Sequence, residues 1–108
     1  MKKHTEESKN NKRCLLCVTE GCEDIETVTV FDTIMRAQNI DLVLAKVPMI
    51  SEMVPTSDLR NELEVRLMQG LRIMCDTLID NVLNEKFDMI ILPGGSGAVR
   101  IAKLFMQG

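Results

Sequence analysis

Apolar residues in this chain gather in three short, nearly continuous runs. The runs cover residues 13–19 (RCLLCVT), 40–47 (IDLVLAKV) and 87–92 (FDMIIL). Runs of this length and composition are typical of strands that are covered on both faces, as in a parallel sheet. We therefore predict three buried strands.

A helix is predicted between the first two runs. From Glu23 to Asn39, apolar residues recur at helical spacing, at Ile25, Val28, Phe31 and Met35. Acidic residues in its first turn suit the positive end of the helix dipole, and Asn39 is the predicted stop. A strand, a helix and a strand joined by short links make a βαβ unit with a right-handed crossover.

The rest of the chain predicts four more segments. Residues 48–62 read as a surface loop, and residues 64–75 alternate polar and apolar around Gln69-Gly70, which predicts a hairpin. Residues 98–107 begin a helix. Residues 76–86 predict a short amphipathic helix with Asp76 near its cap and an inward apolar face of Leu78, Ile79, Val82 and Leu83.

This order of elements predicts an α/β fold with a doubly wound, mostly parallel sheet. We expect residues 1–12 to be a polar, disordered tail that includes His4, and residues 13–108 to form part of one domain. Ligands of such sheets bind beyond the carboxyl ends of the strands, where the strand order reverses. If strands 40–47 and 87–92 flank strand 13–19, the site falls at the loops 20–22 and 93–95.

Composition narrows the classes of partner. The net charge of −3 and the pI of about 5.1 argue against nucleic acid. No apolar run approaches the ~20 residues of a membrane span, and the first dozen residues lack the apolar segment of a signal peptide. We expect a cytoplasmic protein with no membrane partner.

The four cysteines are predicted to be buried and reduced. Cys14 and Cys17 have the C-x-x-C spacing, but side chains three apart on a strand face opposite ways and cannot share a metal or a disulfide. Cys22 and Cys75 do not complete a zinc site. No metal is expected.

Gly94 and Gly95 follow the third run and allow two interpretations. A tight turn after a strand needs glycine for steric reasons alone. Bare backbone would also let a ligand oxyanion reach main-chain N–H donors near a helix start. A dinucleotide fingerprint is excluded because Arg100 stands where a third glycine is needed, and no Gly-Lys-Ser/Thr completes a P-loop.

Glu26 also allows two interpretations. It is either a solvated acid that stabilises the helix start by ~0.3–1 kcal/mol, or a partly buried carboxyl at the switch point. In the second case it would hydrogen-bond a thiol or shuttle a proton.

Two motifs together resemble the ThiJ/PfpI superfamily, in particular its deglycase branch. They are the strand followed by E-G-x-E-x-x-E-T and the stretch "FDMIILPGG" at residues 87–95. The resemblance spans residues 13–47 and 64–97, which is most of the chain. It implies a flavodoxin-like three-layer sandwich, a homodimer and a cysteine nucleophile on an elbow. The glutamate that hydrogen-bonds this cysteine corresponds to Glu26, and the glycine that lends an oxyanion N–H corresponds to Gly95.

In that family the elbow cysteine follows the next strand, and a histidine comes later still. Residues 1–108 end before that strand. We therefore expect the chain to be the amino-terminal part of a longer domain, partnered by the carboxy-terminal part. Cys22, near a helix start that can lower a thiol pKa, is the weak alternative thiol.

Three functions remain open. The first is a cofactor-free glyoxalase or deglycase-like hydrolase or lyase acting on reactive aldehydes or their adducts. The second is a non-enzymatic redox sensor or chaperone-like homodimer of oxidative stress, with Ile25 and Val28 as the dimer contact. The third is an interaction module without chemistry.

Overall fold

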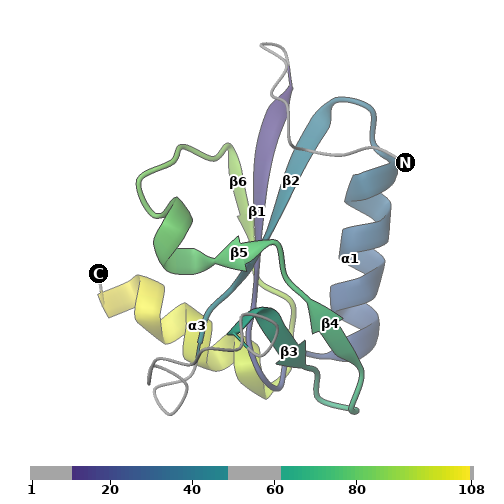
Figure 1. Cartoon of the computed structure of the whole chain (residues 1–108), viewed down its shortest axis with the longest axis vertical. Coiled ribbons are helices and arrows are strands. Elements are labelled where there is room, and N and C mark those ends of the chain that lie inside the picture. Colours follow the sequence, from purple (N-terminus) through teal and green to yellow (C-terminus); the bar gives the residue numbers. More distant parts are fainter. Residues whose placement is uncertain (1–10, 49–61, 108) are drawn as a thin grey trace.

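The computed structural model of the chain describes residues 11–48 and 62–107 (Figure 1). Residues 1–10 of the predicted tail and 49–61 of the predicted surface loop lie outside the described residues. Four parallel strands form one sheet in the order β5-β2-β1-β6. They are β1 Lys12–Val18, β2 Ile40–Lys46, β5 Thr77–Leu78 and β6 Met89–Ile91.

The central strand β1 sets the arrangement that the site requires. It pairs with β2 along its whole length, from Lys12 beside Ile40 to Val18 beside Lys46. On its other side it pairs with β6, where Leu15 lies beside Ile90. This confirms the three predicted strands and their order. β1 begins at Lys12, a residue that the sequence had assigned to the tail.

The core lies on both faces of β1 and β2. Helix α1 Asp24–Arg36 and helix α3 Ser96–Gln107 lie on opposite sides of the strands (Figure 1). Apolar side chains from the sheet and from α3 are buried together, among them Leu15, Leu16, Val18, Leu42, Leu44 and Ile101. The apolar runs at residues 13–19 and 40–47 thus form strands that are covered on both faces, as is typical of a parallel sheet.

Helix α1 confirms the predicted helix, and two of its four predicted apolar positions, Phe31 and Met35, pack against the core, but its predicted end is wrong. Ile25 is 75% exposed and Val28 is 43% exposed, whereas Thr27 is buried and Phe31 and Ile34 pack against the core. The helix ends at Arg36, and Ala37 is already extended. Asn39 is not a left-handed stop, because no described non-glycine residue has a positive φ.

The predicted helix over residues 76–86 is wrong. Thr77 pairs with Ala45 of β2 and so begins strand β5, and only a 3₁₀ turn, η2 Ile79–Val82, follows it. The Asp76 carboxylate accepts the N–H of Leu44 rather than capping a helix. Ile79 and Val82 are buried as predicted, but Leu83 is 61% exposed. Pairing with β2 removes the residues that a regular helix would have needed for its first turn.

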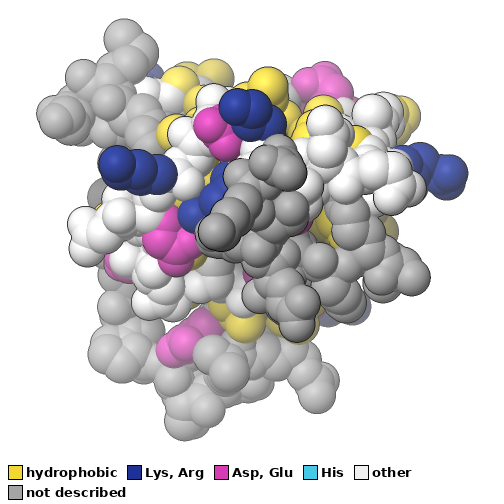
Figure 2. Space-filling view, turned by 90° about the horizontal axis from the view of Figure 1, so that it is seen from above, with side chains coloured by type: hydrophobic (Ala, Val, Ile, Leu, Met, Phe, Trp, Pro, Cys, Tyr) yellow, Lys and Arg dark blue, Asp and Glu magenta, His cyan; other side chains and the backbone are white. Residues whose placement is uncertain are grey.

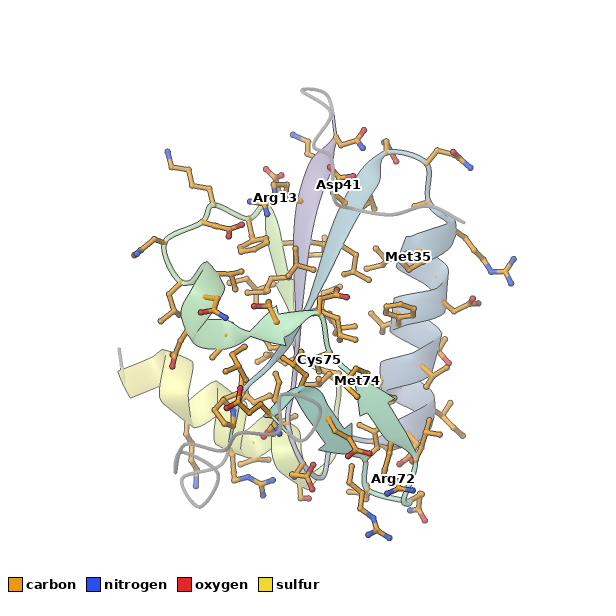
Figure 3. All side chains as sticks on the ribbon, in the orientation of Figure 1. Arg13, Met35, Asp41, Arg72, Met74 and Cys75 are labelled. Atoms are coloured by element: carbon orange, nitrogen blue, oxygen red, sulfur yellow. The ribbon has the colours of Figure 1, made fainter. Side chains whose placement is uncertain are left out.

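The predicted hairpin is confirmed. Strands β3 Glu64–Arg66 and β4 Arg72–Met74 are antiparallel, and Gly70 takes a φ of 111° in the connection. The hairpin lies at the carboxyl end of the sheet, so Arg72 and Met74 are far from Arg13 and Asp41 at the strand starts (Figure 3). The buried Lys46 side chain donates to the Glu64 carbonyl at 2.8 Å and fixes the hairpin to β2.

Strand β6 is less covered than its apolar sequence predicts. Met89 and Ile90 are 56% and 50% exposed although they point to opposite faces. Among the described residues β6 has a neighbour on one side only. The fold is therefore an α/β sheet of flavodoxin-like type that is open at β6.

The surface seen from above in Figure 2 carries both signs of charge, with basic and acidic side chains interspersed among apolar ones. Within residues 11–48 and 62–107, no helix has the length and hydropathy to cross a membrane.

Candidate functional site

The loops that follow β1 and β6 lie against each other at the carboxyl end of the sheet. The N–H of Glu23 donates to the Gly94 carbonyl at 2.8 Å, and the N–H of Gly97 donates to the Gly21 carbonyl at 3.1 Å. Neighbouring parallel strands end at the same edge, so their following loops meet. The structure thus brings together the two loops that the strand order predicted to be neighbours.

Glycine is required here for close approach. Gly95 has a φ of 101°, and a Cβ on it would lie 2.7 Å from both the Glu23 nitrogen and the Gly21 oxygen. A Cβ on Gly97 would lie 2.6 Å from the Glu20 oxygen. The steric interpretation is therefore correct for Gly95. A role of its N–H in ligand binding would be additional to this steric role.

Glu26 joins the two loops through its side chain. Its Oε1 accepts the N–H of Gly94 at 2.8 Å. Its side chain is exposed rather than partly buried. The second oxygen, Oε2, has no hydrogen-bond partner in the described part of the chain.

The two candidate oxyanion donors differ. The N–H of Gly94 is already occupied by the Glu26 carboxylate. The N–H of Gly95 has no acceptor within residues 11–48 and 62–107. Of the two glycines, Gly95 is therefore the one whose N–H lacks an acceptor in the described part of the chain, and Gly94 holds Glu26.

Two other acids, one in the loop after β1 and one at the start of α1, hold the β3–β4 hairpin. The Asp24 carboxylate accepts the N–H of Gln69 at 2.6 Å and that of Leu71 at 3.1 Å. Glu20 accepts the N–H of Arg66. No sequence pattern predicts these contacts, because the partners lie more than 40 residues apart and offer only backbone groups.

Glu23 is the site residue that sequence reasoning missed. It is the N-cap of α1, and its Oε1 accepts the N–H of Glu26 at 3.0 Å. The spacing E-x-x-E between Glu23 and Glu26, placed before a helical pattern, is a variant of the capping box and would have indicated it.

The thiols in the structure are buried and free, as predicted. Burial raises the pKa of Cys22, and the Thr19 backbone and Arg100 lower it by less. Burial raises the pKa of Cys17 and of Cys75 to about 12. The lowered thiol pKa that a helix start would give Cys22 is not what the structure shows, so the site geometry disfavours Cys22 as a nucleophile.

Two further features complete the surroundings. Within the described ranges no group of three or more His, Cys, Asp or Glu side chains could hold a metal ion. An apolar cavity of about 250 Å³ opens between α1, β2 and β4. Its lining residues are Thr27, Val28, Phe31, Leu44, Ile73 and Met74.

Solved structures of DJ-1 proteins are similar to this chain in fold. Drosophila melanogaster DJ-1beta is similar with a TM-score of 0.67 and 26% identity, covering 84% of this chain and 42% of that protein. Oxidized Toxoplasma gondii DJ-1 is similar with a TM-score of 0.63 and 29% identity, covering 89% of this chain and 50% of that protein. The chain thus spans half or less of these structures.

Sequence comparison gives the same relationship. Protein DJ-1 homolog B of Arabidopsis thaliana is 30% identical over 88 residues, which are 82% of this chain and 17% of that protein. Protein DJ-1 homolog A of the same plant is 33% identical over 89 residues, 82% of this chain and 19% of that protein. The DJ-1/PfpI family matches residues 12–106, and this chain therefore belongs to the DJ-1/PfpI family.

Proposed function

We propose that the chain supplies the glutamate and glycine half of a cysteine-dependent, cofactor-free glyoxalase or protein deglycase-like site. The substrate class is reactive aldehydes or their protein adducts, and the catalytic cysteine comes from outside this chain. The observation that carries the proposal is the Glu26 carboxylate, held 2.8 Å from the Gly94 N–H beside the open N–H of Gly95.

The chemistry follows from what these groups can do. An incoming thiol loses its proton to Glu26 Oε2 while its sulfur forms a bond to the aldehyde carbon, and the carbonyl π pair moves to oxygen. The N–H of Gly95 donates to that developing oxyanion. Glu26 then returns the proton to the oxygen, so the product of this step is a neutral hemithioacetal and the carboxylate is restored.

The first test is turnover of methylglyoxal by the longest natural polypeptide that contains these residues. Glu26→Gln keeps the acceptor for Gly94 but cannot take a proton, so kcat should fall by about 10²–10⁴-fold. Asp32→Asn, which changes another exposed carboxyl of α1, should leave kcat unchanged. Equal kcat in wild type and Glu26→Gln would refute the role of Glu26.

The alternative function is a redox-sensing or chaperone-like homodimer. It is supported by the exposed Ile25 and Val28 on α1, next to the apolar cavity that Val28 and Met74 line. Exposed apolar side chains around a cavity are typical of protein contact sites. An antiparallel second copy of α1 would place acidic Glu26 near basic Arg36 of its partner and oppose the two helix dipoles.

Sedimentation and peroxide treatment separate the two functions. Val28→Lys should convert a dimer to a monomer, whereas Thr29→Lys, an exposed neighbour, is the matched control. A sensor should show a cysteine oxidised to sulfinic acid and no aldehyde turnover. The buried free thiols of this chain fit a reducing, cytoplasmic compartment.

A further inference from the structure

The start of helix α1 contains a hydrogen-bonded ring that passes through the opposite loop. The Glu23 carboxylate accepts the N–H of Glu26 at 3.0 Å. The N–H of Glu23 donates to the Gly94 carbonyl at 2.8 Å, and the N–H of Gly94 donates to Glu26 Oε1 at 2.8 Å. Both main-chain groups of Gly94 are therefore used by one helix start.

This ring is a variant of the capping box in which Gly94, from the opposite loop, lies between the two capping residues. In the ordinary motif the N-cap side chain accepts the N–H of the third helical residue, whose own side chain reaches back to the N-cap N–H. Here Glu23 and Glu26 occupy these two positions. The return bond does not form, because the N–H of Glu23 is taken by Gly94 and the Glu26 carboxylate binds the N–H of Gly94 instead.

Gly94 leaves room for the Glu26 carboxylate. A Cβ on Gly94 would clash with Glu26 Oε1, and this end of the flexible side chain would have to move. The bare Cα thus allows the carboxylate to approach, and the N–H holds it. Bonds from a carboxylate to a backbone N–H are stronger than neutral ones, so the carboxylate orientation is well determined.

We infer that Glu23 and Gly94 are positioning residues that fix the Glu26 carboxylate for its work at the site. Resting on the proposed function, the inference assigns one oxygen of Glu26 to the scaffold and leaves the other for the reacting proton. Glu23 touches no substrate. It acts by setting the start of α1 and by placing the Gly94 peptide where Glu26 can bind it.

Amide exchange of residue 94, measured by NMR on the labelled chain, tests the geometry without any activity. Glu23→Ala should speed exchange at Gly94 by about tenfold through loss of the ring. Glu23→Asp, a shorter carboxylate that is a favoured N-cap, should retain protection. Equal protection in Glu23→Ala and wild type would overturn the inference, as would Glu23→Asp exchanging as fast as Glu23→Ala.

Kinetics then separate positioning from helix stability. Gly94→Ala should displace the Glu26 carboxylate while the Glu26 amide, bound to Glu23, stays protected. In the longest natural polypeptide that contains the chain, it should lower kcat by about tenfold or more with little change in KM. Gly70→Ala is the matched glycine control. Unchanged kcat in an active Gly94→Ala enzyme would refute the positioning role, whereas absence of turnover in wild type would refute the proposed function and leave the exchange result to decide the inference.

Discussion

The loops at the carboxyl end of the sheet and the outer edge of strand β6 are built in opposite ways. In the loops, the backbone groups of Gly21, Glu23 and Gly94 find partners across the loop contact, and no added Cβ would fit at Gly95. At the edge, Met89 and Ile90 are half-exposed and the strand has one neighbour among the described residues. The contact between the two loops is thus well formed within the described residues, whereas apolar burial is incomplete at the neighbouring strand edge.

The comparison shows that the hydrogen bonds of the loops and the burial of the sheet edge depend on different parts of the structure. The loop contact needs only β1, β6 and the starts of α1 and α3. Covering β6 needs another strand and the layers that lie over it, because an edge strand buries its side chains only when the sheet continues or a segment lies over it.

The largest expected effect contrasts two side chains that lie side by side. Leu15 on β1 is 4% exposed and its register partner Ile90 on β6 is 50% exposed. Leu15→Ala should lower the free energy of unfolding by about 3 kcal/mol and Ile90→Ala by about 1 kcal/mol, because only the first removes fully buried surface and leaves a cavity. Urea unfolding of both variants measures the difference. Equal losses would mean that β6 is covered and that the contrast between loop and edge is wrong.

A second test sharpens the loop side of the comparison with two glycines. Gly95→Ala should cost about 3 kcal/mol, since it adds both a left-handed φ penalty and a clash with two backbone atoms. Gly70→Ala at a φ of 111° has only the far end of Arg66 near it and should cost about 1 kcal/mol. Thermal or urea unfolding gives both values. If the two costs agree, the loops are looser than the structure shows.

The buried thiols give the pH dependence of the closed core. The pKa of Cys17 is raised to about 12 by burial, and that of Cys75 likewise. A raised folded pKa contributes stability that is complete below the unfolded pKa of about 9 and is lost as pH rises toward 12. Between these two pH values the free energy of unfolding should fall by about 1.4 kcal/mol per pH unit for each such thiol. Cys17→Ala should remove the contribution of one thiol from that slope. An unchanged slope in Cys17→Ala would contradict burial as the cause.

Much of the fold follows from the sequence for a physical reason. Continuous apolar residues predict the strands at 13–19, 40–47 and 87–92. Alternating polar and apolar residues around Gly70 predict the hairpin, and Gly70 takes the positive φ of its turn. The segment 76–86 was misread because two strand residues and one 3₁₀ turn contain the same apolar spacing as a short helix. Only tertiary pairing with β2 distinguishes them.

The candidate site was predictable in place but not in detail. Strand order alone located the loops after β1 and β6, and the resemblance pointed to Glu26 and Gly95. The sequence could not show that Gly94 binds Glu26, because this bond joins residues that lie 68 positions apart. The exposure of Glu26 and of β6 depends on what packs beside them, which no local pattern encodes.

The smallest expected effect concerns the tether between the β1 loop and the hairpin. Asp24→Ala removes the acceptor of the Gln69 and Leu71 amides and should lower the free energy of unfolding by about 1 kcal/mol. Asp32→Ala removes only an exposed pair with Arg36 on the same helix, worth about 0.3 kcal/mol. Amide exchange at Gln69 and Leu71 should quicken in the first variant and stay unchanged in the second. If Asp24→Ala left both amides protected, the hairpin would be held by its other contacts, such as those of Lys46 and Glu20, and Asp24 would not be the tether of the hairpin tip.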